Sequence, residues 1–148
     1  MRETTEPTAR VAALVGPHRS GKTSLLESLL HTSHAIPKKG RVRAGTCVSD
    51  IAPEARARGA SVEVTPVAAD YLGERWTWLD CPGSVELAAS AYAALSVADV
   101  AIVVCEPEKE RAITAAPVLR HLDAHAIPHV LFINKVDTVG DAARLRET

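Results

Sequence analysis

The sequence predicts an α/β fold, in which a mostly parallel sheet has an antiparallel hairpin at one edge and helices on both faces. Three observations support this prediction. Apolar runs alternate with helix-prone segments along most of the chain. The first apolar run leads directly into a glycine-rich loop and then into a leucine-rich helix. Near the middle, two segments of alternating apolar and polar residues are close enough to pair as a hairpin.

The composition is that of an ordinary globular protein. Of the 148 residues, 47% are apolar and 24% are charged, which suits one domain with a sizeable core. The net charge of −1 indicates neither direct DNA binding nor membrane association, and we expect a monomer. The three cysteines form no C-x-x-C pair, which favours a reducing, cytoplasmic location. Residues 1–9 are polar and are expected to form a flexible tail rather than a secretion signal.

The first elements follow from the apolar pattern. Val11–Val15 is an unbroken apolar run, which is typical of a buried parallel strand. Leucines spaced at i, i+4 over Ser24–Leu30 predict a helix that fades near residues 32–34. Residues 36–59 then lose all periodicity and are rich in Lys, Arg and Gly. They form either a solvated basic loop or a mobile segment that closes over phosphates, and their place directly after the helix favours the second interpretation.

A hairpin is predicted next. Ser61–Thr65 alternates apolar and polar residues, and Pro66 indicates a sheet edge. Glu74–Leu79 alternates again after a turn at Gly73, so the two segments can pair as antiparallel strands. The later elements are expected to be a helix over residues 85–95, a strand over 100–105, a helix over 114–125 with Pro117 in its first turn, a strand over 130–133, and a helix from Gly140 onward.

A phosphate-binding loop is predicted between the first strand and the first helix, because the sequence there matches G-x-x-x-x-G-K-S/T at every fixed position. The loop consists of Gly16, Pro17, His18, Arg19, Ser20, Gly21, Lys22 and Thr23. Its glycines let successive backbone N–H groups point inward at a phosphate chain. Lys22 is expected to reach the outer phosphates, and the Thr23 hydroxyl is expected to ligate Mg²⁺.

A second motif, Asp80-Cys81-Pro82-Gly83, follows the second strand of the hairpin. A carboxylate at the end of a strand beside the phosphate loop can hold Mg²⁺, usually through water, so Asp80 is a candidate for this role. Gly83 offers a backbone N–H that a terminal phosphate can approach without a side chain in the way. This motif is therefore a candidate sensor of the γ-phosphate.

The third motif, Asn134-Lys135-Val136-Asp137, follows the last predicted strand. The Asp137 carboxylate can accept from both the ring N–H and the amino group of guanine, whereas adenine would leave it unpaired. Asn134 can bond the other edge of the purine, and the stem of Lys135 can lie along the ring. The motif predicts GTP rather than ATP as the ligand.

Together these motifs resemble the N-terminal part of the GTP-binding domain of translational GTPases of the elongation factor G family, and in particular its divergent elongation-factor-G-like bacterial branch. The resemblance covers residues 11–137. It implies a P-loop NTPase fold of the Ras-like G domain type over residues 10–148, C-terminally truncated before one further strand and helix. It also implies GTP or GDP with Mg²⁺ as cofactors, GTP hydrolysis, and the ribosome as partner. Ser61 stands where the family has a Mg²⁺-ligating threonine, so the candidate metal ligands are Thr23, Ser61 and Asp80.

Two departures from the family pattern bear on hydrolysis. Arg19 replaces an acidic residue of the phosphate loop, and Ser84 replaces the histidine that positions the attacking water. Serine is too short and too weak a base for that role. The candidate catalytic residues are Lys22, Gly83 and, in place of the histidine, Ser84. We therefore expect a slow GTPase. The alternatives are a GTP-binding regulatory module with little or no hydrolysis and an ATP-using kinase or ATPase, and the third motif argues against the last.

Several other residues are expected to be structural. Cys81 and Cys105 are expected to be small buried apolar residues. Trp76 and Trp78 lie on one face of their strand and are expected to pack. The four-residue spacing of His121, His125 and His129 could indicate a metal-binding face, but a solvated helix face is the expected explanation.

Overall fold

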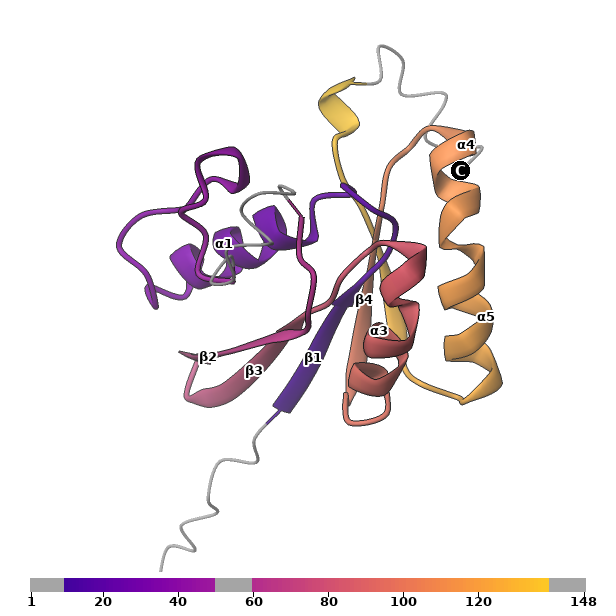
Figure 1. Ribbon diagram of the computed structural model, residues 1–148. Helices are drawn as coiled ribbons and strands as arrows, with labels where there is room; N and C mark the ends of the chain where they lie inside the picture. Colours follow the sequence, from indigo (N-terminus) through magenta and orange to yellow (C-terminus); the bar gives the residue numbers. More distant parts are fainter. Residues whose placement is uncertain (1–9, 50–59, 139–148) are drawn as a thin grey trace, which may run out of the picture.

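The computed structural model describes residues 10–49 and 60–138. The predicted tail, the second half of the basic segment and the predicted helix from Gly140 lie outside these residues. A mixed sheet of five strands forms the centre of the described chain, in the order β2-β3-β1-β4-β5 (Figure 1). The strands are β1 Arg10–Val15, β2 Thr65–Tyr71, β3 Glu74–Asp80, β4 Val100–Cys105 and β5 His129–Ile133. Within this sheet β2 pairs antiparallel and the other pairs are parallel, which confirms a mostly parallel sheet with an edge hairpin.

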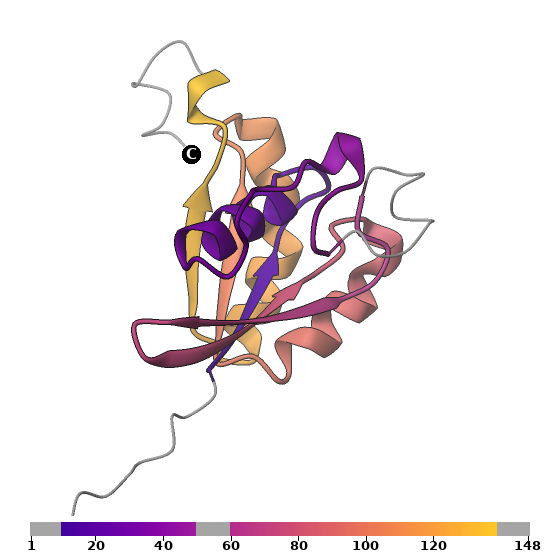
Figure 2. The ribbon, with the colours of Figure 1, turned by 90° about the vertical axis from the view of Figure 1, so that its left-hand side faces the viewer.

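Helices cover both faces of the sheet, as predicted. Helix α1 (Lys22–Thr32) lies on one face, whereas α3 (Ala88–Leu95) and α5 (Ala116–Ala124) lie on the other (Figures 1 and 2). The shorter helical elements are α4 Lys109–Ala112 and the 3-10 turns η1 Val42–Ala44, η2 Val85–Leu87, η3 Ile113–Ala115 and η4 Val136–Thr138. No helix among the described residues is both long enough and apolar enough to span a membrane.

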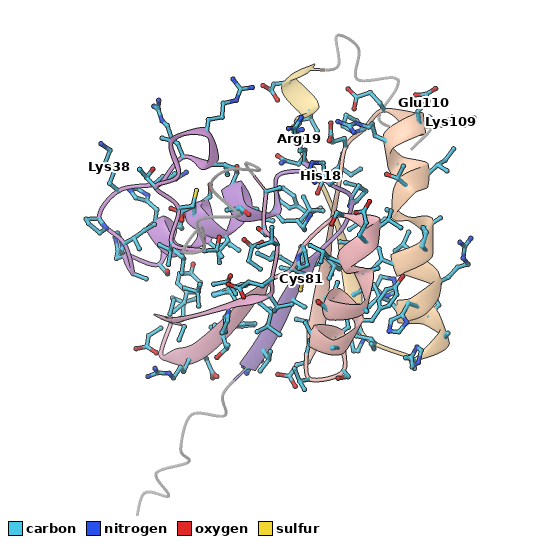
Figure 3. All side chains as sticks on the ribbon, viewed as in Figure 1. His18, Arg19, Lys38, Cys81, Lys109 and Glu110 are labelled. Carbon is cyan, nitrogen blue, oxygen red and sulfur yellow. The ribbon has the colours of Figure 1, made fainter. Side chains whose placement is uncertain are left out.

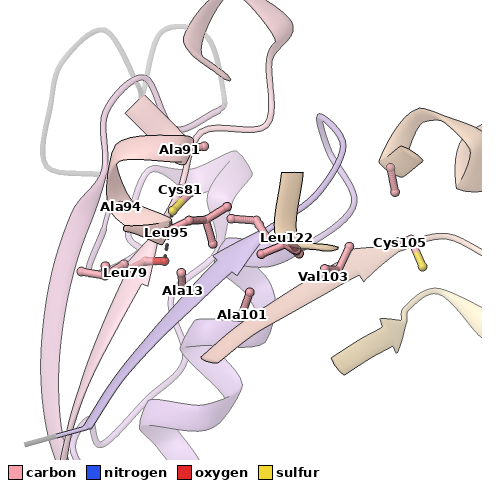
Figure 4. Close-up of a cluster of buried hydrophobic side chains, with 12 residues drawn as sticks. Ala13, Leu79, Cys81, Ala91, Ala94, Leu95, Ala101, Val103, Cys105 and Leu122 are labelled. Atoms are coloured by element: carbon pink, nitrogen blue, oxygen red, sulfur yellow. Dashed lines mark hydrogen bonds between the residues drawn. The ribbon is translucent and has the colours of Figure 1, made fainter. Parts of the chain in front are cut away.

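The alternation of side chains along β1 explains the two layers of core. Ala13 and Val15 point to the face covered by α3 and α5, and Leu14 points to the face covered by α1. Figure 4 shows how Leu95 and Leu122 close the first layer over the small residues of the central strands. The small side chains on these strands let the helices approach the sheet closely, and all the leucines of this cluster are at most 8% exposed.

The first strand of the hairpin differs from its prediction. The strand expected at residues 61–65 lies instead at Thr65–Tyr71. The turn explains the shift, because Leu72 and Gly73 both have positive φ (52° and 80°), as a two-residue hairpin turn requires. Tyr71 therefore pairs with Glu74, and the register runs back to Thr65 opposite Asp80. Pro66 does lie on an edge strand, as predicted.

The predicted helix over residues 114–125 begins earlier than expected. Helical turns run without a break from Lys109 through α5, which ends at Ala124, and Pro117 lies in the first turn of α5 as predicted. The histidines at the end of α5 are expected to form a solvated helix face. His125 is exposed, whereas the ring of His121 stacks on Tyr92 with 4.2 Å between the ring centroids.

Two smaller expectations are confirmed. The rings of Trp76 and Trp78 lie on the same side of β3 and stack with 5.4 Å between their centroids. The guanidinium of Arg10 lies over the Trp76 ring, 5.7 Å from its centroid. Cys81 and Cys105 are buried, and burial raises the pKa of the Cys81 thiol to about 12.

Candidate nucleotide-binding site

The predicted phosphate loop joins β1 to α1 at the carboxyl edge of the sheet. This is where open α/β sheets place their ligands. A cavity of about 600 Å³ opens beside it. Its lining residues are His18, Arg19, Gly21, Lys22, Thr23, Ser24, Gly40, Arg41, Val42, Arg43, Ala60, Ser61, Cys81, Gly83 and Lys135. Figure 3 shows His18 and Arg19 in the loop, with Cys81 below them. The first two predicted motifs therefore face one cavity.

Lys22 is folded back over its own loop. Its ammonium donates to the carbonyl oxygens of Gly16 and Pro17, at 3.0 and 2.9 Å, and the residue is 6% exposed. Burial lowers the pKa of Lys22 to about 8, and the nearby carboxylate of Asp80 opposes this shift. An anion bound in the cavity would strongly stabilise this buried ammonium, because the anion replaces the interactions with water that burial has removed.

Glycine is required at two positions around this lysine. Gly21 has a φ of 100°, and an added Cβ would collide with the side-chain amide of Asn134. At Gly83, an added Cβ would collide with the Lys22 ammonium and press on the carbonyl oxygens of Pro17 and Gly16. Both positions therefore need a bare backbone to keep the loop and its lysine in place.

The three candidate metal ligands converge at one point. The Thr23 hydroxyl donates to Asp80 Oδ2 at 2.7 Å, and the Ser61 hydroxyl lies 3.4 Å from the same oxygen and 3.3 Å from Thr23 Oγ1. Asp80 is fully buried, and its Oδ1 has no hydrogen-bond partner among the described residues. Two hydroxyls and a buried carboxylate with an unpartnered oxygen suit Mg²⁺, which prefers hard oxygen ligands.

The environment of Asp80 indicates that a bound cation would stabilise its buried negative charge. Burial raises the pKa of this carboxyl group, while the hydroxyls of Thr23 and Ser61 and the ammonium of Lys22 partly offset the increase. The described side chains therefore compensate the charge of this carboxylate only in part.

The third motif contacts the phosphate loop directly. Asn134 Nδ2 donates to the carbonyl oxygen of Ser20 at 2.9 Å, and Lys135 Nζ donates to that of Arg19 at 2.8 Å. Asp137 lies in η4 and is exposed, and it is not among the residues that line the cavity. The structure therefore brings Asn134 and Lys135 against the loop, while the role of Asp137 in base recognition stays a prediction.

Arg19 and Ser84, the two residues that depart from the family pattern, lie at different places relative to the cavity. Arg19 is exposed at the cavity, and its backbone has a positive φ of 61°. Ser84 precedes η2 without capping it through its side chain, and the cavity is lined by Gly83 but not by Ser84. The imidazole of His18 does line the cavity, and burial together with the charges of Arg19 and Lys22 lowers its pKa.

One buried residue at this site was not predicted from the sequence. Glu27 on α1 is 2% exposed, and its carboxylate accepts from the backbone N–H groups of Gly40 and Val48, both at 2.6 Å. Glu27 therefore binds the basic segment that follows α1 to the helix. Part of this segment lines the cavity. The only signal in the sequence is a charged residue next to Leu26 and three residues before Leu30, on the face that α1 buries.

Comparisons with known proteins agree with this geometry. Residues 8–148 match the family described as elongation factor Tu GTP binding domain. The chain is 48% identical over 137 residues to an elongation factor G-like protein of Synechocystis, covering 93% of this chain and 20% of that protein. It is 32% identical over 146 residues to elongation factor G 2 of Streptomyces coelicolor, covering 95% of this chain and 20% of that protein.

A solved structure supports the same relationship. A crystal structure of a protein from Thermus thermophilus superposes with a TM-score of 0.86 at 32% identity, over 93% of this chain and 21% of that one. The chain thus spans about a fifth of the length of the relatives it matches. It belongs to the elongation factor Tu GTP-binding domain family, as a G domain of the elongation-factor-G-like kind.

Proposed function

We propose that this chain is the GTP-binding domain of an elongation-factor-G-like translational GTPase, which binds GTP or GDP with Mg²⁺ and hydrolyses GTP to GDP and phosphate. The observation that carries the proposal is the meeting of three motifs at one edge of the sheet. There the Thr23 hydroxyl is hydrogen-bonded to Asp80, and the Asn134 side chain is hydrogen-bonded to the Ser20 carbonyl oxygen. Family membership and the relatives named elongation factor G support it.

Each motif has a proposed task. Lys22 and the backbone N–H of Gly83 hold the outer phosphates, and Asn134 and Asp137 bind the guanine base. Thr23, Ser61 and Asp80 would hold Mg²⁺. When bound, Mg²⁺ neutralises charge that develops on the phosphates. The residues of the chain bind and orient the nucleotide, because phosphoryl transfer depends mainly on positioning and electrostatics.

We propose that hydrolysis is slow. Ser84 has no basic side chain and does not line the cavity, and Arg19 places a positive charge where the family has an acidic one. The second candidate, a GTP-binding regulatory module with little or no hydrolysis, is favoured by the same two residues. Nucleotide binding is expected in both cases, since neither residue provides a predicted side-chain contact to phosphate or base.

Partners and domain organisation are also proposed. We assign residues 10–148 to the GTP-binding domain. By analogy with elongation factors, the ribosome would be the partner and the cytoplasm the location. The relative named ribosome-releasing factor 2, from Bos taurus mitochondria, is 31% identical over 121 residues, which is in line with a ribosomal partner.

The test uses protein expressed from the complete gene. Binding is measured with a fluorescent GTP analogue in competition with excess ATP, and we expect ATP not to compete. Single-turnover hydrolysis is then measured with and without ribosomes for the wild type, Ser84→His and Ser90→His. Ser90 is exposed on α3, so its substitution is a matched control.

We expect ribosomes to stimulate hydrolysis and Ser84→His to raise the rate at least about tenfold, since a positioned acid–base group contributes roughly 10²–10⁴-fold. Ser90→His should change nothing. Wild-type hydrolysis as fast as that of an ordinary elongation factor G would refute the slow-hydrolysis proposal. No guanine nucleotide binding at all would refute the function.

A further inference from the structure

A third buried carboxylate lies beside the third motif and has no part in the site described so far. Glu106 directly follows β4 and is 7% exposed. The neighbouring Cys105 accepts a backbone hydrogen bond from Asn134 N–H at 2.8 Å. The residue after β4 and the loop after β5 are thereby held side by side at the edge of the sheet where the cavity opens.

Two cations share this carboxylate unequally. Glu106 Oε1 lies 3.1 Å from Lys135 Nζ and 3.5 Å from Arg111 Nη2. The side chain of Arg111 is 51% exposed and that of Lys135 is 36% exposed. The nearer, less exposed partner compensates a buried carboxylate more strongly, because water screens its charge less. Lys135 is therefore the main partner of Glu106.

The ammonium of Lys135 is consequently held from two sides. Glu106 contacts it from the end of β4, and the Arg19 carbonyl oxygen accepts from it in the phosphate loop. The backbone of Lys135 has a φ of 58° and that of Arg19 has a φ of 61°. Non-glycine residues stay in this region only when their surroundings hold them there, which indicates that the contact is structurally constrained.

We infer that Glu106 is a positioning residue, which holds Lys135 against the phosphate loop before nucleotide arrives and thereby raises the affinity for guanine nucleotides. The inference rests on the proposed function, since it assumes that the Lys135 stem lies along the base. Without Glu106, the long lysine side chain would have to be ordered during binding, at a cost to affinity.

The direction in which nucleotide affinity changes when Glu106 is neutralised distinguishes a positioning role from a purely electrostatic one. A nucleotide is an anion, so if Glu106 acted only as a nearby negative charge, its neutralisation would strengthen binding. If Glu106 positions Lys135, its neutralisation weakens binding. The expected loss is between about twofold and tenfold, which is the cost of immobilising one long side chain.

The experiment is a double-mutant cycle on protein from the complete gene, with the Kd of a fluorescent GDP analogue as readout and thermal unfolding as a check on folding. Glu106→Gln should raise Kd in the wild type but have no further effect in Lys135→Met. The matched control is Arg111→Gln, which removes the other cation and should leave Kd within about twofold.

Each outcome decides the matter. An unchanged or lowered Kd in Glu106→Gln overturns the inference, and so does an equal increase in the wild-type and Lys135→Met backgrounds. An equal loss in Arg111→Gln also overturns it. If Glu106→Gln does not fold, Glu106→Asp, which keeps the charge but shortens its reach, is tested in the same cycle. A wild type that binds no guanine nucleotide refutes the proposed function itself, whereas binding with an additive cycle refutes only the role of Glu106.

Discussion

Asp80 should stabilise the nucleotide complex while it destabilises the empty protein. In Asp80→Asn, the amide oxygen can still accept from the hydroxyls of Thr23 and Ser61, and the buried negative charge is removed. Burial raises the pKa of Asp80, so at neutral pH the charged carboxylate is less favourable in the folded protein than in the unfolded chain. We therefore expect Asp80→Asn to raise the free energy of unfolding at pH 7 in EDTA without nucleotide by about 0.5–2 kcal/mol, the range typical of stabilising substitutions at sites kept for function.

The raised pKa of Asp80 also determines how the stability difference between wild type and Asp80→Asn should vary with pH. Burial raises the pKa of Asp80 above its ordinary value of 3.8, so the folded state binds this proton more tightly than the unfolded state does. Stability is consequently lost as the pH rises from 3.8 through the higher folded pKa. The advantage of Asp80→Asn should grow as the pH rises above 3.8 and should vanish well below that pH, where both states of the wild type are protonated.

The assay is thermal or urea unfolding of wild type and Asp80→Asn at pH 7 and at about pH 3, roughly one unit below the unfolded pKa. One kcal/mol corresponds to a shift in Tm of roughly 2–4 °C for a chain of this size. Asp70→Asn, on the exposed side of β2, is the control and should change stability by less than about 0.5 kcal/mol. A less stable Asp80→Asn at pH 7, or an equal gain at both pH values, would refute the reasoning. With Mg²⁺ and GDP present the order should reverse, because the variant loses a candidate metal ligand.

Two further predictions concern Lys22 and Glu27. Because burial lowers the pKa of Lys22 to about 8, the empty protein should become more stable between about pH 8 and 10, where only the unfolded state still carries this proton; Lys22→Met should abolish that rise in Tm. GDP affinity should fall over the same range, and an affinity independent of pH would contradict this. Glu27→Ala removes the acceptor of Gly40 and Val48 and should cost about 2–4 kcal/mol by urea unfolding. Glu86→Ala, at an exposed position, is its control, and equal effects would show that the buried contacts contribute nothing.

The sequence predicts best what depends on neighbouring residues. A phosphate loop is one continuous segment, so its lysine and hydroxyl are placed by their covalent neighbours. Asp80 could be placed because it ends a strand that pairs directly with β1, where Leu14 stands opposite it. The layered architecture followed from unbroken apolar runs such as Val100–Cys105, which only a sheet covered on both faces can bury.

What the sequence did not reveal depends on contacts between distant segments. The position of β2 is set by the turn after Tyr71, and the apolar alternation over residues 61–65 gave a misleading signal. Glu27 carries no local sign that its partners are backbone groups 13 and 21 residues further on. The pairing of Glu106 with Lys135 likewise joins the ends of two strands, so neither residue alone predicts it.

The stacked tryptophans determine which optical signals this chain can give. Both of its tryptophans lie on β3, with their rings in contact, and Trp76 pairs with Arg10 at the start of β1. The cavity opens at the other end of these strands. The emission of Trp76 and Trp78 should therefore change when the hairpin side of the sheet unfolds and should respond little to nucleotide exchange. Their emission can then report unfolding of this part of the sheet, while a labelled nucleotide reports occupancy of the cavity.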